Sequence, residues 1–375
     1  MRIMIATVTA GAGHLQAAAA LEEAWRDLRP KDTLERLDVL EFTPKLYRKM
    51  YVDGYVKLVA HAPELWGLMF KKTDNPTLTK KLVRFRRALA QWNTTKFIRR
   101  LKQFKPDVVL CTHYMPAEIL GRLRAGEKLK PPPLTVSVVT DFEAHALWME
   151  PAVDLYCVAA EETRTRLLAR EVPAEQVLVT GIPIGARFSS KIETGAVRRR
   201  LGLRDDLPVI LVLGGGFGMG PVGKIVAQLN KLQTAVQVVV VCGRNEELRR
   251  ELAVGDRRHP THVLGFVTNM HELMAIAAVV LTKPGGLTSS EALALGRPMF
   301  ILDPIPGQEA ANSDFLLEQG AAVKANRVED LPLRLDKLLN SSKLGEMSCA
   351  ARALGKPGAA QAICHAVLTR LAKTA

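Results

Sequence analysis

The chain has 375 residues. A single hydrophobic core does not usually organise a chain of this length, so the length predicts two domains. Its composition, 48% hydrophobic and 24% charged, is typical of a folded protein and excludes a disordered one. No apolar run approaches the ~18 residues of a membrane-spanning helix, and the opening MRIMIATV lacks the layout of a signal peptide, so we expect a cytoplasmic protein.

The net charge of +14 is concentrated in one part of the chain. Residues 41–105 contain 16 Lys and Arg against four Asp and Glu, which gives this segment a net charge of +12. A basic face of this kind attracts either nucleic acid or an anionic membrane surface. A solvated helix face is the plain alternative.

The N-terminal half alternates strands with helices. A β-rich run at residues 2–10 leads through AGAGH into an alanine-rich helix that ends near Asp27, and residues 33–40 predict a second strand. Residues 44–70 mix aromatic residues with Lys and Arg, and from Lys80 a three- and four-residue spacing of apolar residues predicts an amphipathic helix. The next strands are expected at residues 108–111, 134–139 and 155–158.

The alternation is interrupted at residues 182–194 and then restarts. A strand at residues 208–213, a glycine-rich turn and a helix open a second series, which continues to a last helix at residues 357–373. This pattern predicts an α/β fold with parallel sheets wound by right-handed crossovers. We expect domains at residues 1–185 and 186–355, with residues 356–375 forming a helix that packs back across the lobes.

Each half has a glycine-rich turn after its first strand. The turn at residues 11–14 lacks the third glycine of GxGxxG because Gln16 takes its place, so a dinucleotide site is poorly supported. No GK[ST] follows any glycine cluster, which excludes a P-loop. The turn at residues 214–218 is the better phosphate cradle, because backbone amides before a helix can approach a diphosphate, although glycine clusters also make ordinary connections.

Two later loops carry polar residues at the expected carboxyl ends of parallel strands, where such folds bind ligands. In KPGGLTSSEAL, Ser289 or Ser290 could simply cap a helix. Glu291 could either complement the helix dipole or accept hydrogen bonds from a ribose diol. In IPGQEAAN, the adjacent Gln308 and Glu309 at a helix start suit the recognition of sugar hydroxyls.

The chain resembles the inverting glycosyltransferases of the GT-B fold that make diacylglycerol glycolipids. The resemblance rests on AGAGH, TDFEAHALW, VLVTGIPI, LGGGFGMG, KPGGLTSSEAL and IPGQEAAN, and it covers most of the chain. That group, in glycosyltransferase family 28, includes the processive diacylglycerol glucosyltransferases and the monogalactosyldiacylglycerol synthases. The peptidoglycan lipid-intermediate N-acetylglucosaminyltransferase is a more distant relative. The resemblance implies two Rossmann-like domains that face a central cleft.

The resemblance also implies roles for single residues. His14 would be the general base that takes the proton of the acceptor hydroxyl; the alternative is a helix-start histidine without a function. Residues expected to bind the donor are Gly215, Gly216, Phe217, Phe266, Val267, Gly285, Gly286, Thr288, Glu291, Gln308 and Glu309. Residues expected on the acceptor side are Gly13, Asp141, His145 and Trp148, with interdomain packing as the alternative for the last two.

The other histidines show no partner pattern and are expected to be structural or exposed: His61, His113, His259, His262, His271 and His365. No DxD motif is present, since Asp205 and Asp206 are adjacent, and the cysteines form no CxxC pair. We therefore expect no tightly bound metal and no cofactor. Helix ends and backbone amides would stabilise the leaving diphosphate.

The same resemblance implies that the basic segment docks the N-terminal lobe on a bilayer. Side chains expected at the membrane are Tyr51, Tyr55, Trp66, Phe70, Lys71 and Lys72, with Tyr47, Leu65, Leu68, Met69, Lys45, Arg48 and Lys49 as further candidates. Some of these residues are expected in the core instead.

We therefore predict an inverting enzyme that moves a hexose from a UDP-sugar to diacylglycerol. We expect it to act at the cytoplasmic face of a membrane that contains anionic lipids, and we expect no nucleic-acid partner. A transferase acting on a polyprenyl-linked lipid is one alternative. A UDP-N-acetylglucosamine 2-epimerase is another, which shares the fold but needs additional acidic residues. A nucleic-acid-binding protein would leave the two polar loops without a purpose. Glucose or galactose as the donor sugar and the oligomeric state stay open.

Overall fold

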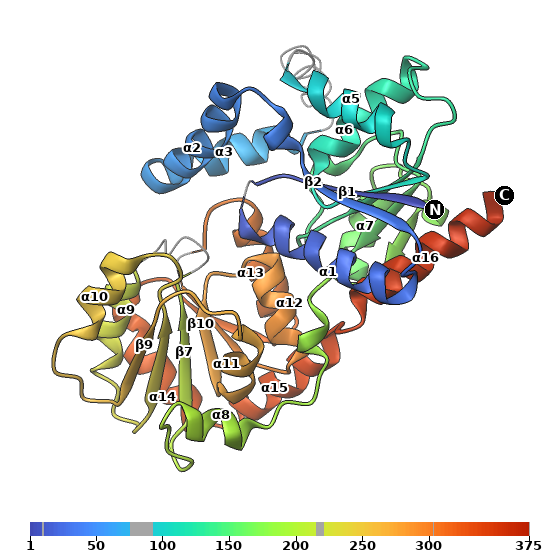
Figure 1. Cartoon of the computed structure of the whole chain (residues 1–375). Coiled ribbons are helices and arrows are strands. Elements are labelled where there is room, and N and C mark those ends of the chain that lie inside the picture. The colour runs from blue at the N-terminus through green and yellow to red at the C-terminus, as the bar shows by residue number, and fades with distance from the viewer. Residues whose placement is uncertain (10, 76–92, 215–220, 303, 375) are drawn as a thin grey trace. The chain divides into compact units, whose positions relative to one another are not determined.

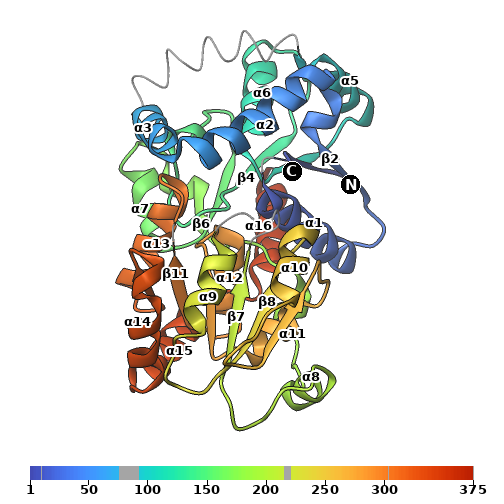
Figure 2. The same cartoon turned by 90° about the vertical axis from the view of Figure 1, so that its left-hand side faces the viewer.

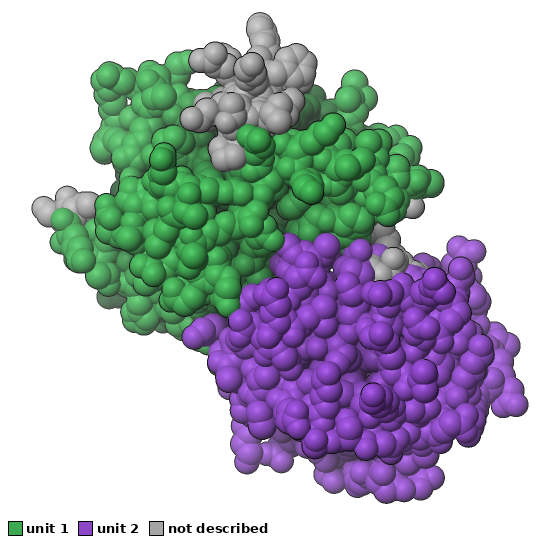
Figure 3. Space-filling view, turned by 180° about the vertical axis from the view of Figure 1, so that it is seen from behind, with its two compact units in different colours: residues 1–186, 305–308, 357–375 green, residues 187–304, 309–356 purple. Residues whose placement is uncertain are grey.

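The computed structural model describes residues 1–9, 11–75, 93–214, 221–302 and 304–374. These residues form two compact units, which Figure 3 shows in separate colours. Unit 1 comprises Met1–Ala186, Ile305–Gln308 and Pro357–Ala375, and unit 2 comprises Arg187–Pro304 and Glu309–Lys356. Within the described part of the chain, no helix is long and apolar enough to cross a membrane.

Unit 1 is built on a parallel sheet of six strands in the order β2-β1-β3-β4-β5-β6. The order places β1 next to both β2 and β3, with Ile3 opposite Val108, so the chain winds outward in two directions from β1. β3 is buried along its whole length, as expected for a parallel strand covered on both faces. The strands are β1 (Arg2–Thr7), β2 (Thr33–Asp38), β3 (Val108–Cys111), β4 (Leu134–Val138), β5 (Leu155–Val158) and β6 (Val177–Val179).

Helices cover both faces of this sheet. On one face α1 and α16 lie side by side, as Figures 1 and 2 both show, and Trp25 and Ile363 share a core cluster with Ile3. Phe97 and Leu120 belong to the cluster on the other face. The helices are α1 (Ala12–Leu28), α2 (Lys45–His61), α3 (Pro63–Thr73), α5 (Thr95–Phe104), α6 (Tyr114–Ala125), α7 (Glu161–Leu168) and α16 (Ala359–Thr374).

The C-terminal helix α16 is part of unit 1 although the chain reaches it from unit 2. Ile363, Cys364 and Val367 are buried against the sheet. The Arg370 guanidinium donates hydrogen bonds to the backbone carbonyls of Asp154 and Glu175, each at 3.2 Å. The last residues of the chain therefore complete the core of unit 1.

Unit 2 repeats the same architecture with a parallel sheet of six strands in the order β12-β11-β10-β7-β8-β9. These strands are β7 (Val209–Leu213), β8 (Gln237–Val241), β9 (Thr261–Leu264), β10 (Val279–Thr282), β11 (Met299–Leu302) and β12 (Ala322–Ala325). The helices are α8 (Thr194–Arg200), α9 (Val222–Leu229), α10 (Glu246–Ala253), α11 (Met270–Ile276), α12 (Gly286–Ala294), α13 (Gln308–Glu318), α14 (Leu331–Leu339) and α15 (Lys343–Leu354). The expected class, α/β with two doubly wound halves, is confirmed.

Some element ends differ from the prediction for local reasons. β1 ends at Thr7, and β2 ends at Asp38, where the strand expected to reach Leu40 gives way to a 3-10 helix, Val39–Phe42. The Asp38 carboxylate causes this turn, because it accepts the backbone N–H of Leu40 at 2.9 Å. Of the helix expected from Lys80, the structure describes α5; its expected apolar residues Leu82, Phe85, Leu89 and Trp92 lie outside the described residues.

Candidate active site

His14 lies on the first turn of α1, directly after the turn that follows β1. Gly11 makes this turn with φ of +126°, a conformation that glycine adopts without strain. The Nδ1 atom of His14 lies 2.8 Å from the backbone carbonyl oxygen of Thr112. A carbonyl oxygen can only accept, so Nδ1 carries the hydrogen and the basic lone pair of the neutral ring is on Nε2.

Three strand ends hold His14 in this orientation. Thr112, immediately after β3, is fully buried, and its hydroxyl lies 2.9 Å from Oγ1 of Thr7 and 3.1 Å from the backbone carbonyl of His14. The Thr140 hydroxyl, two residues after β4, lies 3.0 Å from Nδ1. The imidazole is therefore fixed by rigid elements of the sheet, as a group that must meet a reacting atom has to be.

The surroundings of His14 favour its neutral form. Burial lowers the pKa of His14, although the Asp141 carboxylate and the hydrogen bond to the Thr112 carbonyl act in the opposite direction. A histidine with a lowered pKa is unprotonated at neutral pH and can accept a proton. The same Asp141 would stabilise the imidazolium once the proton has been taken.

Aromatic rings line the neighbourhood of His14. The His113 ring meets it edge-on with centroids 4.9 Å apart, and Trp148 lies 6.4 Å away. His113 is buried and caps α6, since its Nδ1 accepts the backbone N–H of Met115. The sequence pattern gave His113 no role beside His14. The order β1-β3 could have revealed this proximity, because both histidines follow the carboxyl ends of neighbouring strands.

Of the residues expected on the acceptor side, all but His145 lie near His14 in the structure. Asp141 and Trp148 lie near His14, and Gly13 precedes it in α1. His145 faces α3 instead: its Nδ1 accepts the N–H of Leu147, so Nε2 carries the hydrogen and donates to the backbone carbonyl of Phe70 at 2.9 Å. These contacts of His145 are packing contacts inside unit 1.

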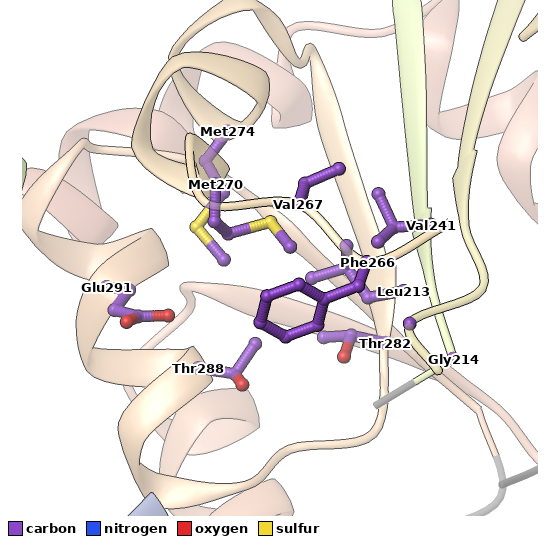
Figure 4. A pocket seen from close by; sticks show the side chains of 11 residues that line it. Leu213, Gly214, Val241, Phe266, Val267, Met270, Met274, Thr282, Thr288 and Glu291 are labelled. Carbon is purple, nitrogen blue, oxygen red and sulfur yellow. The ribbon is translucent and has the colours of Figure 1, made fainter. Parts of the chain in front are cut away.

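Unit 2 contains a pocket at the carboxyl ends of β7, β8 and β10, with a cavity volume of about 130 Å³. Figure 4 shows the side chains of Phe266, Thr288 and Glu291 around a common space. The guanidinium of Arg244 lies over the Phe266 ring, 5.5 Å from its centroid. The pocket is lined by Leu213, Gly214, Val241, Gly243, Phe266, Val267, Met270, Met274, Thr282, Thr288 and Glu291.

Four of the expected donor-binding residues, Phe266, Val267, Thr288 and Glu291, therefore come together in this pocket. Gly285 is the N-cap of α12 and Gly286 its first residue, and a Cβ on Gly285 would meet nothing within 4 Å. A small side chain at Gly285 would therefore meet no neighbour. Gly215, Gly216 and Phe217 lie outside the described residues, although the neighbouring Gly214 lines the pocket.

Glu291 has an unusual protonation equilibrium. Burial raises the pKa of the Glu291 carboxyl to about 8, although the charge of Arg187 acts in the opposite direction. Arg187 itself donates to the backbone carbonyl of Thr268 at 2.7 Å. A carboxyl group poised near neutral pH in a pocket with mostly apolar lining residues is typical of a binding or catalytic site. Among the described residues, no three His, Cys, Asp or Glu side chains converge as metal ligands do.

Gln308 and Glu309 are the first two residues of α13, which follows the loop after β11. Both side chains are half-buried. Gly307, directly before them, has φ of +99°, which only glycine adopts easily. The division between the two units falls between Gln308 and Glu309.

The residues expected at a membrane divide into two sets on α2 and α3. Tyr51, Trp66 and Phe70 are half-buried, and the Tyr51 hydroxyl lies 3.0 Å from that of Tyr114. Nothing is described for the Tyr55 side chain. The exposed residues of these helices include Lys45, Leu46, Arg48, Lys49, Met50, Leu65, Leu68, Met69, Lys71 and Lys72, of which Leu46 and Met50 were not expected at the bilayer.

Comparison with known proteins relates both units to one group. The family model for monogalactosyldiacylglycerol (MGDG) synthase matches residues 14–184, and that for the glycosyltransferase family 28 C-terminal domain matches residues 209–363. The processive diacylglycerol beta-glucosyltransferases of Bacillus cereus and Bacillus thuringiensis are each 30% identical to the chain, over 98% of its length and 93% of theirs.

Solved structures agree on the fold. MurG of Acinetobacter baumannii is similar with a TM-score of 0.62 and 17% identity, over 98% of this chain and 99% of that one. The UDP complex of Staphylococcus aureus MnaA gives a TM-score of 0.62 at 13% identity, over 99% of this chain and 96% of that one. Together with the two parallel sheets, these similarities identify the GT-B fold, and the sequence relatives identify the group within it. The chain belongs to glycosyltransferase family 28, among the processive diacylglycerol beta-glucosyltransferases and MGDG synthases.

Proposed function

We propose that the protein transfers glucose from UDP-glucose to the hydroxyl of diacylglycerol, with inversion, to form β-glucosyldiacylglycerol at an anionic membrane surface. The names of the Bacillus relatives support the acceptor and favour glucose over galactose. The observations that carry the proposal are the neutral, rigidly held histidine of unit 1 and, within unit 2, the pocket that Phe266, Thr288 and Glu291 line.

The pocket of unit 2 would hold the UDP part of the donor. The Phe266 ring and the methionine side chains of α11 offer an apolar surface for the uracil base. Glu291 would accept hydrogen bonds from the ribose hydroxyls. The N-terminus of α12, with glycines at its start, would present backbone amides to the diphosphate.

His14 would perform the proton transfer. Its Nε2 takes the proton from the diacylglycerol hydroxyl while that oxygen forms a bond to the anomeric carbon of the glucose. The bond between the anomeric carbon and the diphosphate oxygen breaks, and its electron pair leaves with UDP. Helix-end amides stabilise the charge on the leaving group, so the step needs no tightly bound metal. Attack on the face opposite the leaving group yields the β-glycoside.

The exposed side chains of α2 and α3 would carry the protein to its lipid substrate. Leu68 and Met69 are 59% and 45% exposed, and Lys71 and Lys72 follow them on the same helix. Apolar residues beside lysines suit an interface with anionic headgroups, because the former enter the acyl boundary and the latter attract the surface charge.

The identity of the product tests this proposal. The protein is incubated with UDP-glucose and vesicles of an anionic phospholipid with and without diacylglycerol, and the extracted lipids are analysed by mass and by the proton coupling at the anomeric carbon. We expect a glucosyl lipid with β-coupling that requires diacylglycerol. An α-coupled product would refute inversion. A polyprenyl-phosphate lipid that serves in place of diacylglycerol would refute the acceptor.

A further inference from the structure

The helix α3 has two different faces. Leu65, Leu68 and Met69 occupy one face at helical spacing and are 51%, 59% and 45% exposed. Gly67 and Phe70 lie on another face and contact the loop Ile305–Gln308, which belongs to the same unit. One short helix therefore presents apolar side chains outward and packs against the loop that leads into α13.

This contact depends on close approach at two glycines. A Cβ on Gly67 would lie 2.7 Å from the Cβ of Pro306, and a Cβ on Gly307 would lie 2.8 Å from Cγ of Phe70. Both distances are too short for carbon atoms. The Phe70 ring therefore rests directly on the backbone of Gly307, which also needs its glycine for its φ of +99°.

Phe70 is itself held firmly inside unit 1. Its ring centroid lies 4.3 Å from that of His145, and its backbone carbonyl accepts the Nε2 hydrogen of His145. Asp74, just after α3, accepts hydrogen bonds from Arg170 at 2.8 and 2.9 Å and from the Ala146 N–H at 2.8 Å. The end of α3 is thus fixed to the chain around residues 145–146 and to the end of α7.

We propose that Phe70 is a positioning residue for the donor sugar. Gln308 follows Gly307 directly and belongs to the same unit, so the packing of Phe70 on Gly307 fixes the backbone next to Gln308. This inference rests on the proposed function, in which Gln308 binds the hexose. The same helix that meets the bilayer through Leu68 then fixes the sugar-binding loop.

The test separates the sugar from the nucleotide. The dissociation constants of UDP and UDP-glucose are measured by calorimetry for the wild type and for Phe70→Ala, and binding to anionic diacylglycerol vesicles is measured by sedimentation. For Phe70→Ala we expect UDP-glucose binding about tenfold weaker, the change in affinity expected when a misplaced binding group loses about one hydrogen bond to the sugar. UDP binding and vesicle binding should change less than twofold. Phe70→Leu, which keeps an apolar contact, should restore part of the UDP-glucose affinity.

Leu68→Glu is the complementary variant on the exposed face. It should lose vesicle binding and keep the wild-type affinity for UDP-glucose, whereas Leu333→Glu, at a leucine of α14 that is also exposed, should change neither. Gly307→Ala provides a second route, because it disturbs the contact from the loop side and should reproduce the UDP-glucose effect of Phe70→Ala.

Two results would overturn the role of Phe70: equal weakening of UDP and UDP-glucose in Phe70→Ala, or no change in either. A failure of the proposed function is recognised separately, in the wild type. A wild-type protein that binds UDP-glucose but transfers nothing to diacylglycerol refutes that function, while the comparison of the two ligands still decides whether Phe70 positions the loop.

Discussion

The Nδ1 atom of His14 donates its hydrogen to the backbone carbonyl of Thr112 across 2.8 Å. Because the acceptor is a main-chain group at the end of a buried strand, it cannot take up or lose a proton and does not move with the substrate. The contact therefore determines the tautomer of His14, and the basic nitrogen is always Nε2. In this respect the Thr112 carbonyl does the work that a carboxylate does in many catalytic histidine pairs.

Replacement of His14 should remove transfer without affecting the donor pocket. We expect His14→Ala to lower kcat about 10²- to 10⁴-fold, the usual contribution of a general base. The dissociation constant of UDP should stay unchanged, since the pocket that would hold it belongs to unit 2. His365→Ala, at an exposed histidine of α16, is the matched control. Full activity in His14→Ala would assign the base to another residue.

The pH dependence of kcat should report the pKa of His14. Burial lowers this pKa, so the base is already neutral above the ordinary histidine value of 6.5 and the acid limb of the profile should lie below it. The Asp141 carboxylate raises the pKa, so Asp141→Asn should move the limb to still lower pH and reduce the maximal rate. A limb that moves to higher pH in Asp141→Asn would show that Asp141 does not act electrostatically on His14.

The affinity of Glu291 for ribose should depend on pH in a higher range than the acid limb of His14. The carboxyl has a pKa of about 8 in the unliganded protein, whereas ribose hydroxyls that donate to it favour the carboxylate, so binding releases a proton. Affinity should then rise with pH up to about 8, by at most about tenfold per pH unit. Uridine is the suitable ligand, because it carries no phosphate that titrates. This pH dependence should vanish in Glu291→Gln and persist in the control Glu329→Gln, at an exposed glutamate of unit 2. An affinity of the wild type that does not change with pH would exclude Glu291 as the ribose ligand.

Membrane binding should be electrostatic and should involve the end of α3. Each Lys near an anionic surface contributes about 1 kcal/mol, so the double change Lys71→Glu and Lys72→Glu should weaken binding to anionic vesicles by more than tenfold. Binding to uncharged vesicles should be unaffected. The control is the double change Lys337→Glu and Lys343→Glu, which alters the net charge equally at exposed positions of unit 2. Equal loss in both would indicate a general charge effect.

The ion pairs of Asp74 should stabilise unit 1. Burial alone would raise the pKa of Asp74, but the hydrogen bonds from Arg170 and the Ala146 amide outweigh it and leave the pKa below its usual value. The stabilisation is therefore present above about pH 4 and lost as the pH falls through the lowered pKa. Asp74→Ala should reduce the free energy of unfolding by roughly 2 kcal/mol at pH 7, since it removes the carboxylate that pairs with the partly buried Arg170, whereas Arg166 keeps its pair with Glu143. A denaturant titration at pH 7 measures the change.

Much of the fold could be predicted from short-range patterns. Runs such as Val238–Val241 are apolar and β-branched, and strands of this kind between helices admit few arrangements besides parallel, doubly wound sheets. Glu291 could be singled out because it follows a glycine turn at the carboxyl end of a strand, whereas the role expected for His14 came from the family resemblance. The protonation of these groups could not be predicted, since it depends on burial by residues distant in the sequence.

The exposed side chains of α2 and α3 could not be predicted from the sequence. The segment from Leu46 to Phe70 contains apolar and aromatic residues throughout, so their spacing does not predict which side chains are exposed. In the structure Tyr51 packs toward Tyr114, and Phe70 packs on Gly307, more than 200 residues away in the sequence. The outward residues, Leu46 and Met50 among them, follow only once these partners are known.

In the proposed mechanism, His14 activates a lipid hydroxyl for attack on a UDP-sugar. The most direct measurement is the rate of UDP release by the purified protein with UDP-glucose or UDP-galactose, on anionic vesicles with and without diacylglycerol, for the wild type and His14→Ala. We predict release that requires diacylglycerol, is faster with UDP-glucose and disappears in His14→Ala. Release that is independent of the lipid, or that persists in His14→Ala while UDP binding is intact, would contradict it.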